Sequence, residues 1–460
     1  MLKRLAVFTG VLVSLASFAS AEVNFDNPSA NDFGKELGGA VQFSEQAVPV
    51  PVPVQAEDSK GLGHWLYEHT IGLKDRKEWT IMVYINGKND LEKYALKDMN
   101  EMEMIGSSWH VNIVAEVGRM DDFDASDGDW KGTRRYLIAR DTDTARISSP
   151  VVEDLGKSDM GDYKNVVAFG RWAKAKYPAK KYMLVVWNHG AGWLKRDQSR
   201  GKGISYDDET GNHINTPQMG LMLKEIGGVD VYGSDACLMQ MAEVVYELRH
   251  YADYIVGSEE TEPGDGYTYD LMLGPLVRNP KMTPEQFGKT VVDAYSDHYQ
   301  AIGEGSTQSL IKSAALSGLR ISANAFAAAM IGAGEKDLVK KAMEEAQSYA
   351  YIENKDLYHF AQLVVAETKD VRVETAGKAL MYYIRTVLVV RNRTNNGADG
   401  GYWSPPSDYS NSHGIAVYLP GTVLPASYKE LKWSKYSDWD RLIDWIAQPE
   451  KKTEGIGGRV

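Results

Sequence analysis

Short runs of apolar and β-branched residues alternate with amphipathic stretches through the middle of the chain. Runs of about four to eight such residues are typical of buried strands, whereas apolar residues spaced three and four apart are typical of helices. The predicted strands are 79–86, 111–117, 182–187, 229–233 and 252–257, with 134–139 as a further candidate at an edge or in a hairpin. The predicted helices between them are 90–105, 165–177, 217–226 and 238–250. Continuous apolar strands that alternate with helices indicate an α/β fold with a mostly parallel sheet flanked by helices.

The pattern changes beyond residue 280, where helical periodicity dominates. The predicted helices of this part are 284–302, 321–331, 336–349, 356–369, 373–390 and 436–447, and 415–419 is one late strand. We therefore expect an α/β domain over 78–280 and a mainly helical C-terminal region over 281–460 that completes the fold.

The N-terminus has the three parts of a secretory signal peptide. Lys3 and Arg4 provide a positive start, residues 5–18 are apolar, and Ala19-Ser20-Ala21 is a small-residue cleavage site. Residues 1–21 are therefore predicted to be a signal peptide. The sequence predicts an exported protein, periplasmic or extracellular, with no membrane span in the remainder of the chain.

Residues 22–77 lack the sustained periodicity of a packed core. They contain PVPVPV at 49–54, which favours an extended backbone of the polyproline type. We interpret this segment as a leader and a candidate pro-segment.

Charge and cysteine content narrow the classes of function. The 460 residues include 51 Lys and Arg against 63 Asp and Glu, a formal net charge of −12. This balance argues against nucleic acid or an anionic membrane as the main partner, because both need clustered basic residues. The chain has one cysteine, Cys237, which excludes an intramolecular disulfide and a metal cluster built on cysteines.

Two of the predicted strands run directly into reactive side chains. Strand 182–187 is followed by His189 and Gly190, and strand 229–233 is followed by Cys237. Reactive groups of a parallel sheet collect at the carboxyl ends of its strands. If the intervening helix makes a right-handed crossover, these two strands are neighbours and the side chains can share a cleft.

A Cys–His pair suits attack on a carbonyl group. The thiolate is the nucleophile, and the imidazole manages the proton and protonates the leaving amine. A helix that starts at or just after Cys237 would favour the thiolate. Gly190 allows close approach of the backbone, so its N–H and that of Cys237 are candidate oxyanion donors.

Two alternatives stay open for these residues. Cys237 can be a buried small hydrophobe, as many free cysteines are. His413, followed by Gly414, repeats the His-Gly pair, but it precedes the strand 415–419. In a parallel arrangement we therefore expect His413 at the opposite end of the sheet.

Four segments resemble a known family of enzymes. They are WTIMVYINGKNDLE at 79–92, VVWNHGAGW at 185–193, DACLMQMAEVVYELR at 235–249 and SEETEPGDG at 258–266. These segments resemble the clostripain family of cysteine peptidases, strongly over 79–270 and more loosely over 300–420. The resemblance implies a caspase-like fold, endopeptidase activity, and His189 and Cys237 as the catalytic pair.

The resemblance also implies a preference for substrates with Arg or Lys at P1. Asp235, two residues before the nucleophile, is a carboxylate that can hold such a cation. The alternative is that it ends the strand or caps the next helix. Asp265, in the loop 263–266, is a second candidate wall of this pocket, and we interpret Glu259 and Glu260 as loop scaffold.

The acidic stretch 121–129 raises the question of calcium, which some members of the resembled family use. The EF-hand pattern fails here, because glycine is not at the sixth loop position and no glutamate closes the loop. We interpret the stretch as a solvated acidic loop, predict no metal ligands, and expect no required cofactor.

A basic stretch lies between the two reactive segments and contains Lys195, Arg196, Arg200 and Lys202. It is either a solvated loop or, as the resemblance implies, a self-cleavage site. We predict an exported cysteine endopeptidase that acts on proteins or peptides with Arg or Lys at P1. Two alternatives remain: an exported binding or adhesion protein that keeps the fold without turnover, and a peptidase that prefers Asn or Asp at P1.

Overall fold

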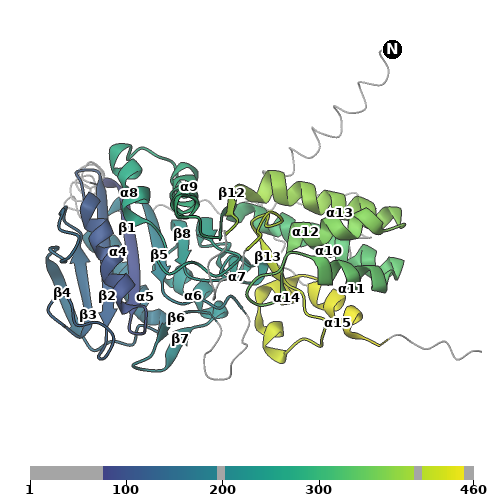
Figure 1. Ribbon diagram of the computed structural model, residues 1–460, viewed down its shortest axis with the longest axis horizontal. Helices are drawn as coiled ribbons and strands as arrows, with labels where there is room; N and C mark the ends of the chain where they lie inside the picture. Colours follow the sequence, from purple (N-terminus) through teal and green to yellow (C-terminus); the bar gives the residue numbers. More distant parts are fainter. Residues whose placement is uncertain (1–75, 194–202, 398–406, 450–460) are drawn as a thin grey trace, which may run out of the picture. The chain divides into compact units, whose positions relative to one another are not determined.

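A nine-stranded sheet forms the centre of the computed structural model, which describes residues 76–193, 203–397 and 407–449 (Figure 1). The predicted signal peptide, nearly all of the predicted leader and the basic stretch 195–202 lie outside the described residues. The strands of this sheet are β1 (Lys77–Gly87), β2 (Val111–Arg119), β3 (Gly132–Leu137), β4 (Val151–Gly156), β5 (Ala179–Trp187), β8 (Val229–Asp235), β9 (Ala252–Gly257), β10 (Ser306–Lys312) and β12 (Val389–Asn395).

The order of strands is β12-β10-β9-β8-β5-β1-β2-β3-β4. The five central strands, β9 to β2, pair in parallel, and the two strands on each flank pair antiparallel. The α/β class with a large sheet flanked by helices is therefore confirmed, although the sheet is mixed because its flanks are antiparallel. The candidate strand 134–139 corresponds to β3, which forms hairpin pairings with both β2 and β4.

Both faces of the sheet are buried, which explains the continuous apolar runs. In β1, Ile81, Val83 and Ile85 enter one hydrophobic core, and Met82 and Tyr84 enter the other. One face is covered by α4 (Glu92–Ile105), α8 (Tyr269–Arg278) and α9 (Pro284–Ile302). The opposite face is covered by α5 (Tyr163–Lys176), α6 (Thr216–Ile226) and α7 (Ala242–Leu248).

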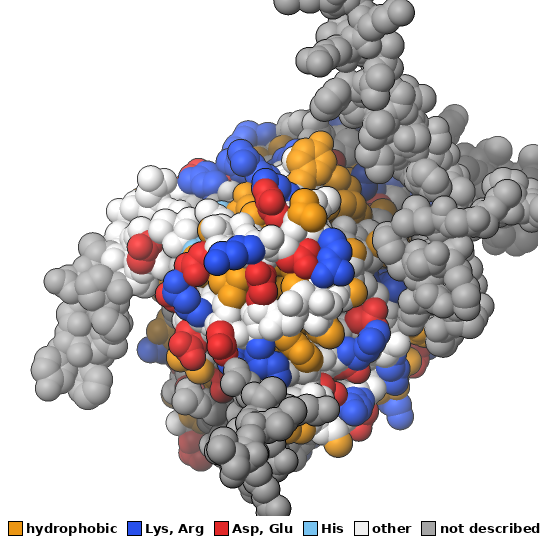
Figure 2. Space-filling view, turned by 90° about the vertical axis from the view of Figure 1, so that its right-hand side faces the viewer, with side chains coloured by type: hydrophobic (Ala, Val, Ile, Leu, Met, Phe, Trp, Pro, Cys, Tyr) orange, Lys and Arg blue, Asp and Glu red, His pale blue; other side chains and the backbone are white. Residues whose placement is uncertain are grey.

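The later part of the chain adds helices and two strands of the main sheet. Its helices are α10 (Leu316–Ala333), α11 (Lys336–Glu345), α12 (Leu357–Glu367), α13 (Val371–Tyr383), α14 (Lys432–Tyr436) and α15 (Trp439–Ala447). The short strands β11 (Asn354–Asp356) and β13 (Ala416–Tyr418) pair with each other. On the face that these helices present, Lys and Arg side chains are interspersed with Asp and Glu (Figure 2).

The predicted helix 373–390 is shorter in the structure. Helix α13 ends at Tyr383, a π-helical turn spans Ile384–Leu388, and β12 begins at Val389. The two valines at 389 and 390 suit an extended backbone, and β12 pairs with β10 at the edge of the sheet. The apolar end of this segment therefore belongs to a strand.

One helical stretch, Ser313–Ala333, is long and apolar enough to cross a membrane by length and composition. An 18-residue window of this stretch, found among the described residues, has a mean hydropathy of 1.3, and 44% of that window is buried inside the fold. Leu319, Ala323 and Phe326 of this stretch belong to the same hydrophobic core as residues of α13 and α15. These contacts are those of a core helix.

Candidate active site

The loops that carry His189 and Cys237 leave the sheet side by side. Strands β5 and β8 are parallel neighbours, and Trp187, the last residue of β5, is opposite Asp235, the last residue of β8. The backbone N–H of Asn188 donates to the carbonyl oxygen of Asp235 at 3.2 Å. The structure therefore brings both loops to one edge of the sheet, at the carboxyl ends of its parallel strands.

Gly190 lies against the backbone of the cysteine turn. A Cβ atom at this position would clash with the carbonyl oxygen of Cys237 and would lie 3.1 Å from its backbone nitrogen. Residues other than glycine therefore cannot occupy position 190 without moving one of the two loops. The approach that we expect of Gly190 toward a substrate, and its role as an oxyanion donor, stay predictions.

Asp90 contacts the imidazole of His189, with Oδ1 of Asp90 2.8 Å from Nε2 of the ring. Asp90 follows β1, the strand next to β5 on the side away from β8. A carboxylate in this position orients the ring. When Nε2 carries the hydrogen that Asp90 accepts, Nδ1 is the nitrogen that can exchange a proton with the thiol.

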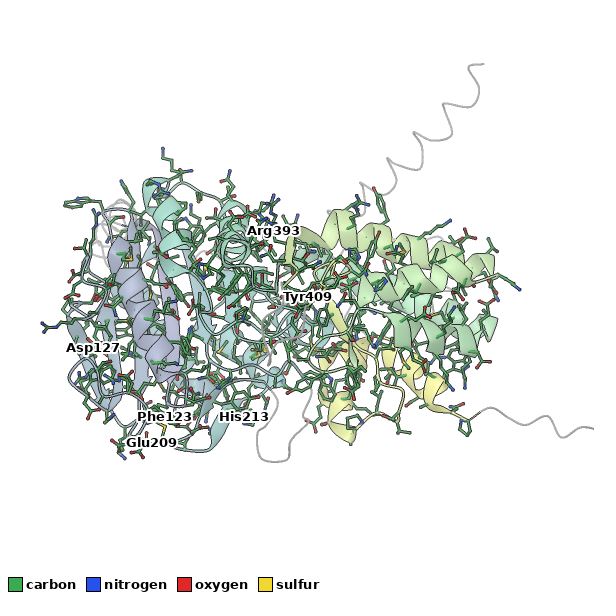
Figure 3. The ribbon with its side chains drawn as sticks, viewed as in Figure 1. Phe123, Asp127, Glu209, His213, Arg393 and Tyr409 are labelled. Carbon is green, nitrogen blue, oxygen red and sulfur yellow. The ribbon has the colours of Figure 1, made fainter. Side chains whose placement is uncertain are left out.

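The loop of His189 is held by its neighbour Asn188, which is buried. The amide Nδ2 of Asn188 donates to the carbonyl oxygen of Asn86 at 2.5 Å, and Oδ1 accepts from the N–H of Tyr206 at 2.8 Å. These bonds tie the loop to β1 and to β6 (Ile204–Asp207), which pairs with β7 (Asn212–Ile214). Glu209 and His213, labelled in Figure 3, belong to this hairpin.

Cys237 lies in a turn and not at the start of a helix. Helix α7 begins at Ala242, so the predicted helix 238–250 starts four residues too early, and the expected thiolate stabilisation by its N-terminus is wrong. The backbone N–H groups of Leu238 and Gln240 donate to the carbonyls of Glu260 and Ser258, and Leu238 has a φ of 66°. These bonds to the neighbouring loop replace the first helical turn.

The thiol of Cys237 lies in a half-buried and acidic environment. Burial raises its pKa to about 12, and the charges of Glu262 and Glu260 act in the same direction. The N–H of Glu262 lies 3.3 Å from Sγ and opposes this effect only in part. At neutral pH the thiol is therefore protonated in this arrangement, and the nucleophile needs a base.

Asp235 is buried two residues before the cysteine. Its Oδ1 accepts from the N–H of Tyr267 at 3.0 Å, and its Oδ2 accepts from the hydroxyl of Tyr269 at 2.8 Å. Burial raises its pKa to about 7. Glu262 and Asp98, its neighbours, have pKa values raised well above the usual range by burial and by the charge of Asp235. The three carboxyl groups therefore retain protons that exposed carboxyls would lose.

The loop with Asp265 packs against Asp235, because a Cβ on Gly266 would lie 2.8 Å from Oδ1 of Asp235. The carboxylate of Asp265 itself is partly exposed and ion-paired with Lys97 of α4, with Nζ 3.1 Å from Oδ1. Lys97 also pairs with Glu101 at 3.2 Å. The structure thus brings the loop of Asp265 against Asp235, but the carboxylate of Asp265 itself is paired with a cation of the same chain.

Glu259 and Glu260 connect this loop to the C-terminal part. Glu259 accepts from the N–H of Gly414 at 3.0 Å, and Glu260 accepts from the N–H of Ala350 at 3.0 Å. His413, the rival histidine, precedes β13 in the small two-stranded sheet, and burial lowers its pKa to about 4. The strand that His413 precedes therefore belongs to the small sheet and not to the main one.

The acidic loop between β2 and β3, which contains Phe123 and Asp127 (Figure 3), surrounds an arginine. The guanidinium of Arg119 donates to the carbonyl oxygens of Ser126 at 3.0 Å and Asp124 at 2.8 Å. Arg119 thus supplies the positive charge at the centre of this loop. Among the described residues, no three His, Cys, Asp or Glu side chains gather where they could hold a metal ion.

The model of the clostripain family, Peptidase C11, matches residues 83–445. The chain belongs to the clostripain family. Clostripain of Hathewaya histolytica is 30% identical over 266 residues, which cover 49% of this chain and 51% of that protein. The match thus spans about half the length of this curated relative.

Two solved structures share the fold. A secreted C11 cysteine protease from Bacteroides thetaiotaomicron, in complex with an irreversible peptide inhibitor, has a TM-score of 0.60 and 23% identity, covering 79% of this chain and 100% of that one. An inactive zymogen C11 protease from Parabacteroides distasonis has a TM-score of 0.61 and 22% identity, covering 78% of this chain and 98% of that one. This family of cysteine peptidases is therefore the one that the sequence motifs predict.

Sequence reasoning missed the residues that come from other strands and helices. Asp90 follows the predicted strand 79–86. Its place at the same edge of the sheet as His189 and Cys237 could therefore have been predicted from the sequence. Lys97 and Asp98 lie inside a helix with ordinary amphipathic spacing, and only tertiary packing brings Asp98 near Asp235 and Lys97 to Asp265.

The raised pKa of Cys237 predicts a distinctive alkylation profile. Because only the thiolate reacts, iodoacetamide should label the folded protein slowly at pH 7, with a rate that rises about tenfold per pH unit up to pH 9. Mass spectrometry of the single cysteine measures the rate, and Cys237→Ala should show no label. The urea-unfolded protein, whose thiol has an ordinary pKa, should level off near pH 9; the same early plateau in the folded protein would contradict the prediction.

Proposed function

We propose that the protein is an exported cysteine endopeptidase that cleaves peptide bonds after Arg or Lys. The observation that carries this proposal is the backbone contact between the loops of His189 and Cys237, with the buried Asp235 two residues before the thiol. Membership of the clostripain family supports the same reaction. The match to clostripain itself covers only half of that protein, so substrate choice is argued from the residues.

In the proposed mechanism, His189 removes the proton of Cys237 as Sγ attacks the carbonyl carbon of the scissile bond. The C–S bond forms, the carbonyl becomes an oxyanion, and the N–H groups of Gly190 and Cys237 are the proposed donors to it. The imidazolium then protonates the leaving amine as the C–N bond breaks. Water, deprotonated by His189, hydrolyses the thioester, and Asp90 keeps the imidazole oriented throughout.

The buried carboxyls around Asp235 support a cationic P1 side chain. Among the described residues, Oδ1 of Asp98 is buried without a hydrogen-bond partner, and the carboxyl groups of Glu262 and Asp235 share a hydrogen bond. Buried carboxylate oxygens without partners are costly, and the ammonium or guanidinium of a substrate would supply both charge and donors. A P1 Asp would add a further negative charge, and a P1 Asn would supply donors but no positive charge, which argues against both.

Asp235 should make recognition of basic residues depend on pH. With a pKa of about 7, its carboxyl is neutral below that pH and negatively charged above it. We expect the ratio of kcat/KM for P1 Arg to that for P1 norleucine to rise as the pH rises through about 7. Using a ratio cancels the titration of Cys237, which affects both fluorogenic substrates equally.

Asp235→Asn removes the charge at nearly constant volume and is the matched variant. It should lower kcat/KM for Arg and Lys substrates by a factor that corresponds to about 2–4 kcal/mol of transition-state stabilisation. It should also flatten the pH dependence of the ratio of kcat/KM for P1 Arg to that for P1 norleucine. An equal loss for all P1 residues would show that Asp235 only supports the fold of the loop.

Lys97 should restrain the preference for basic residues, because it already neutralises Asp265. Lys97→Gln is expected to raise kcat/KM for P1 Arg and Lys by about threefold to tenfold, as exposed charge pairs are worth little more. Norleucine substrates should be unaffected. Lys93→Gln, one turn earlier on the same helix, is the control; a loss of basic selectivity in Lys97→Gln would show that the lysine instead holds the loop in place.

Export and self-processing complete the proposal. The N-terminal residues 1–21 support export, and the Bacteroides thetaiotaomicron protein is described as secreted. The basic residues Lys195, Arg196, Arg200 and Lys202 are the proposed internal cleavage sites. Their stretch is flanked by residues that pair with each other, since the N–H of Ala191 donates to the carbonyl oxygen of Gly203 at 3.0 Å.

Because this bond links the two sides of the basic stretch, we expect the two pieces of a cleaved chain to remain associated in one folded protein. Wild-type protein should run as two or more fragments on a denaturing gel but as one species in gel filtration. Cys237→Ala should remain a single chain and should be cut when active enzyme is added. Wild-type protein that stays intact and is fully active would show that the stretch is only a solvated loop.

One observation favours a second function, that of a binding protein without turnover. The protonated state of Cys237 is what a thiol without a catalytic role would show. A fluorogenic P1 scan on the mature protein separates the two functions, because a binding protein would give no Cys237-dependent hydrolysis at any P1 residue.

A further inference from the structure

A second cleft, of about 330 Å³, lies among residues that have no part in the site above. Its walls come from Tyr358 of α12, the π-helical turn with Ile384 and Arg385, residues 389–392 of β12, and His413. Arg393, labelled in Figure 3, marks the same strand β12 one residue further along. A volume near 300 Å³ is at the lower end of the range for small-ligand sites.

Two buried polar atoms of this cleft have no hydrogen-bond partner among the described residues. They are Nε2 of His413 and Oδ1 of Asn392. The amide Nδ2 of Asn392 donates to the carbonyl oxygen of Ser412 at 2.8 Å, which fixes the amide so that Oδ1 is the free end. Buried polar atoms in native proteins nearly always have partners, so this pair indicates a missing donor and a missing acceptor.

The cleft also holds an arginine that is available for an anion. Arg391 is committed to Asp293, with Nε 2.7 Å from Oδ1. Arg385 is exposed and makes no ion pair with any described residue. Burial, then the charges of His359 and Arg385, lower the pKa of His413 to about 4, so its ring is neutral and can donate one hydrogen bond.

The backbone that presents Arg385 is unusual. Ile384–Leu388 forms a π-helical turn between α13 and β12. Such turns occur mostly as single insertions and are frequent at functional sites. Here Ile384 and Arg385 of the turn line the cleft together with Tyr358 and His413, whose ring centroids are 4.2 Å apart.

We propose that this cleft binds an acylated amino acid with a free α-carboxylate, the chemistry of the C-terminal residue of a peptide. The carboxylate pairs with Arg385 and accepts from the ring of His413, and the amide N–H of the same residue donates to Oδ1 of Asn392. The side chain packs on the Tyr358–His413 rings. The ligand thus supplies both partners that the buried atoms lack, whereas an ionised fatty acid supplies only an acceptor.

The test is isothermal titration of the full chain carrying Cys237→Ala, which prevents turnover. N-acetyl-L-leucine is the probe. N-acetyl-L-leucinamide removes the charge, and 4-methylpentanoate removes the N–H. Each should bind at least about tenfold more weakly than the acid, because each loses one charge-assisted or buried hydrogen bond. The tripeptide N-acetyl-Ala-Ala-Leu distinguishes the sources: tighter binding than N-acetyl-leucine indicates a peptide end, and weaker binding indicates a free acylated amino acid.

Arg385→Gln should weaken binding of the acid by about tenfold and abolish its advantage over the amide. Arg385→Lys should keep part of that advantage, and Lys378→Gln, an exposed cation of α13 paired with Glu374, should change nothing. Because Arg385 is exposed, these variants should fold, which their melting temperatures check. The proposal is wrong if N-acetyl-leucine does not bind, if it binds no better than its amide, or if Arg385→Gln binds it as tightly as the parent.

Discussion

The parallel pairing of β5 with β8 is the constraint on which the candidate site depends. Because Trp187 and Asp235 are opposite each other, the two chains leave the sheet at the same level and their next residues must share one small space. Gly190 makes this possible, since its missing side chain leaves room for the backbone of Cys237. The positions of the histidine, the thiol and the buried aspartate thus follow from one strand pairing and one glycine.

The same packing creates an electrostatic conflict around the thiol. Asp235, Glu262 and Asp98 are buried near one another, where each charge is poorly solvated and repels the next. That environment would strengthen the attraction of a cation, and it also disfavours the thiolate of Cys237. A cationic side chain that entered this group would therefore favour both binding and ionisation of the nucleophile, which couples recognition to reactivity.

The sequence predicted the central strands well because they are buried on both faces and are therefore continuously apolar. Strand β10 escaped prediction because its residues 306–309, Ser-Thr-Gln-Ser, are polar. The structure explains them: the hydroxyl of Thr307 bonds to the loop at Ser258, and that of Ser309 bonds to Gln240. Polar residues that are buried for the sake of tertiary hydrogen bonds have the pattern of a loop, so no local rule identifies them as a strand.

In the candidate site, too, local features of the sequence could be predicted and contacts between distant segments could not. The reactive loops could be predicted, because strand ends that run into His189 and Cys237 are local features of the sequence. Their roles as a catalytic pair, and those of Gly190, Asp235 and Asp265, remain predictions. The pairing of Lys97 with Asp265 and the start of α7 at Ala242 could not be predicted, since both depend on contacts between segments far apart in the chain.

The late strands have a consequence for how the chain acquires its structure. Strand β9 pairs with β10, and β10 with β12, which ends at Asn395. Until those segments have been synthesised, the parallel strands have an open edge at β9 with unpaired backbone groups, the kind of surface that joins other chains. Contacts over such long sequence separations also form slowly. Early termination after residue 280 should therefore yield an aggregating species with the reactive loops intact in sequence but the sheet unfinished.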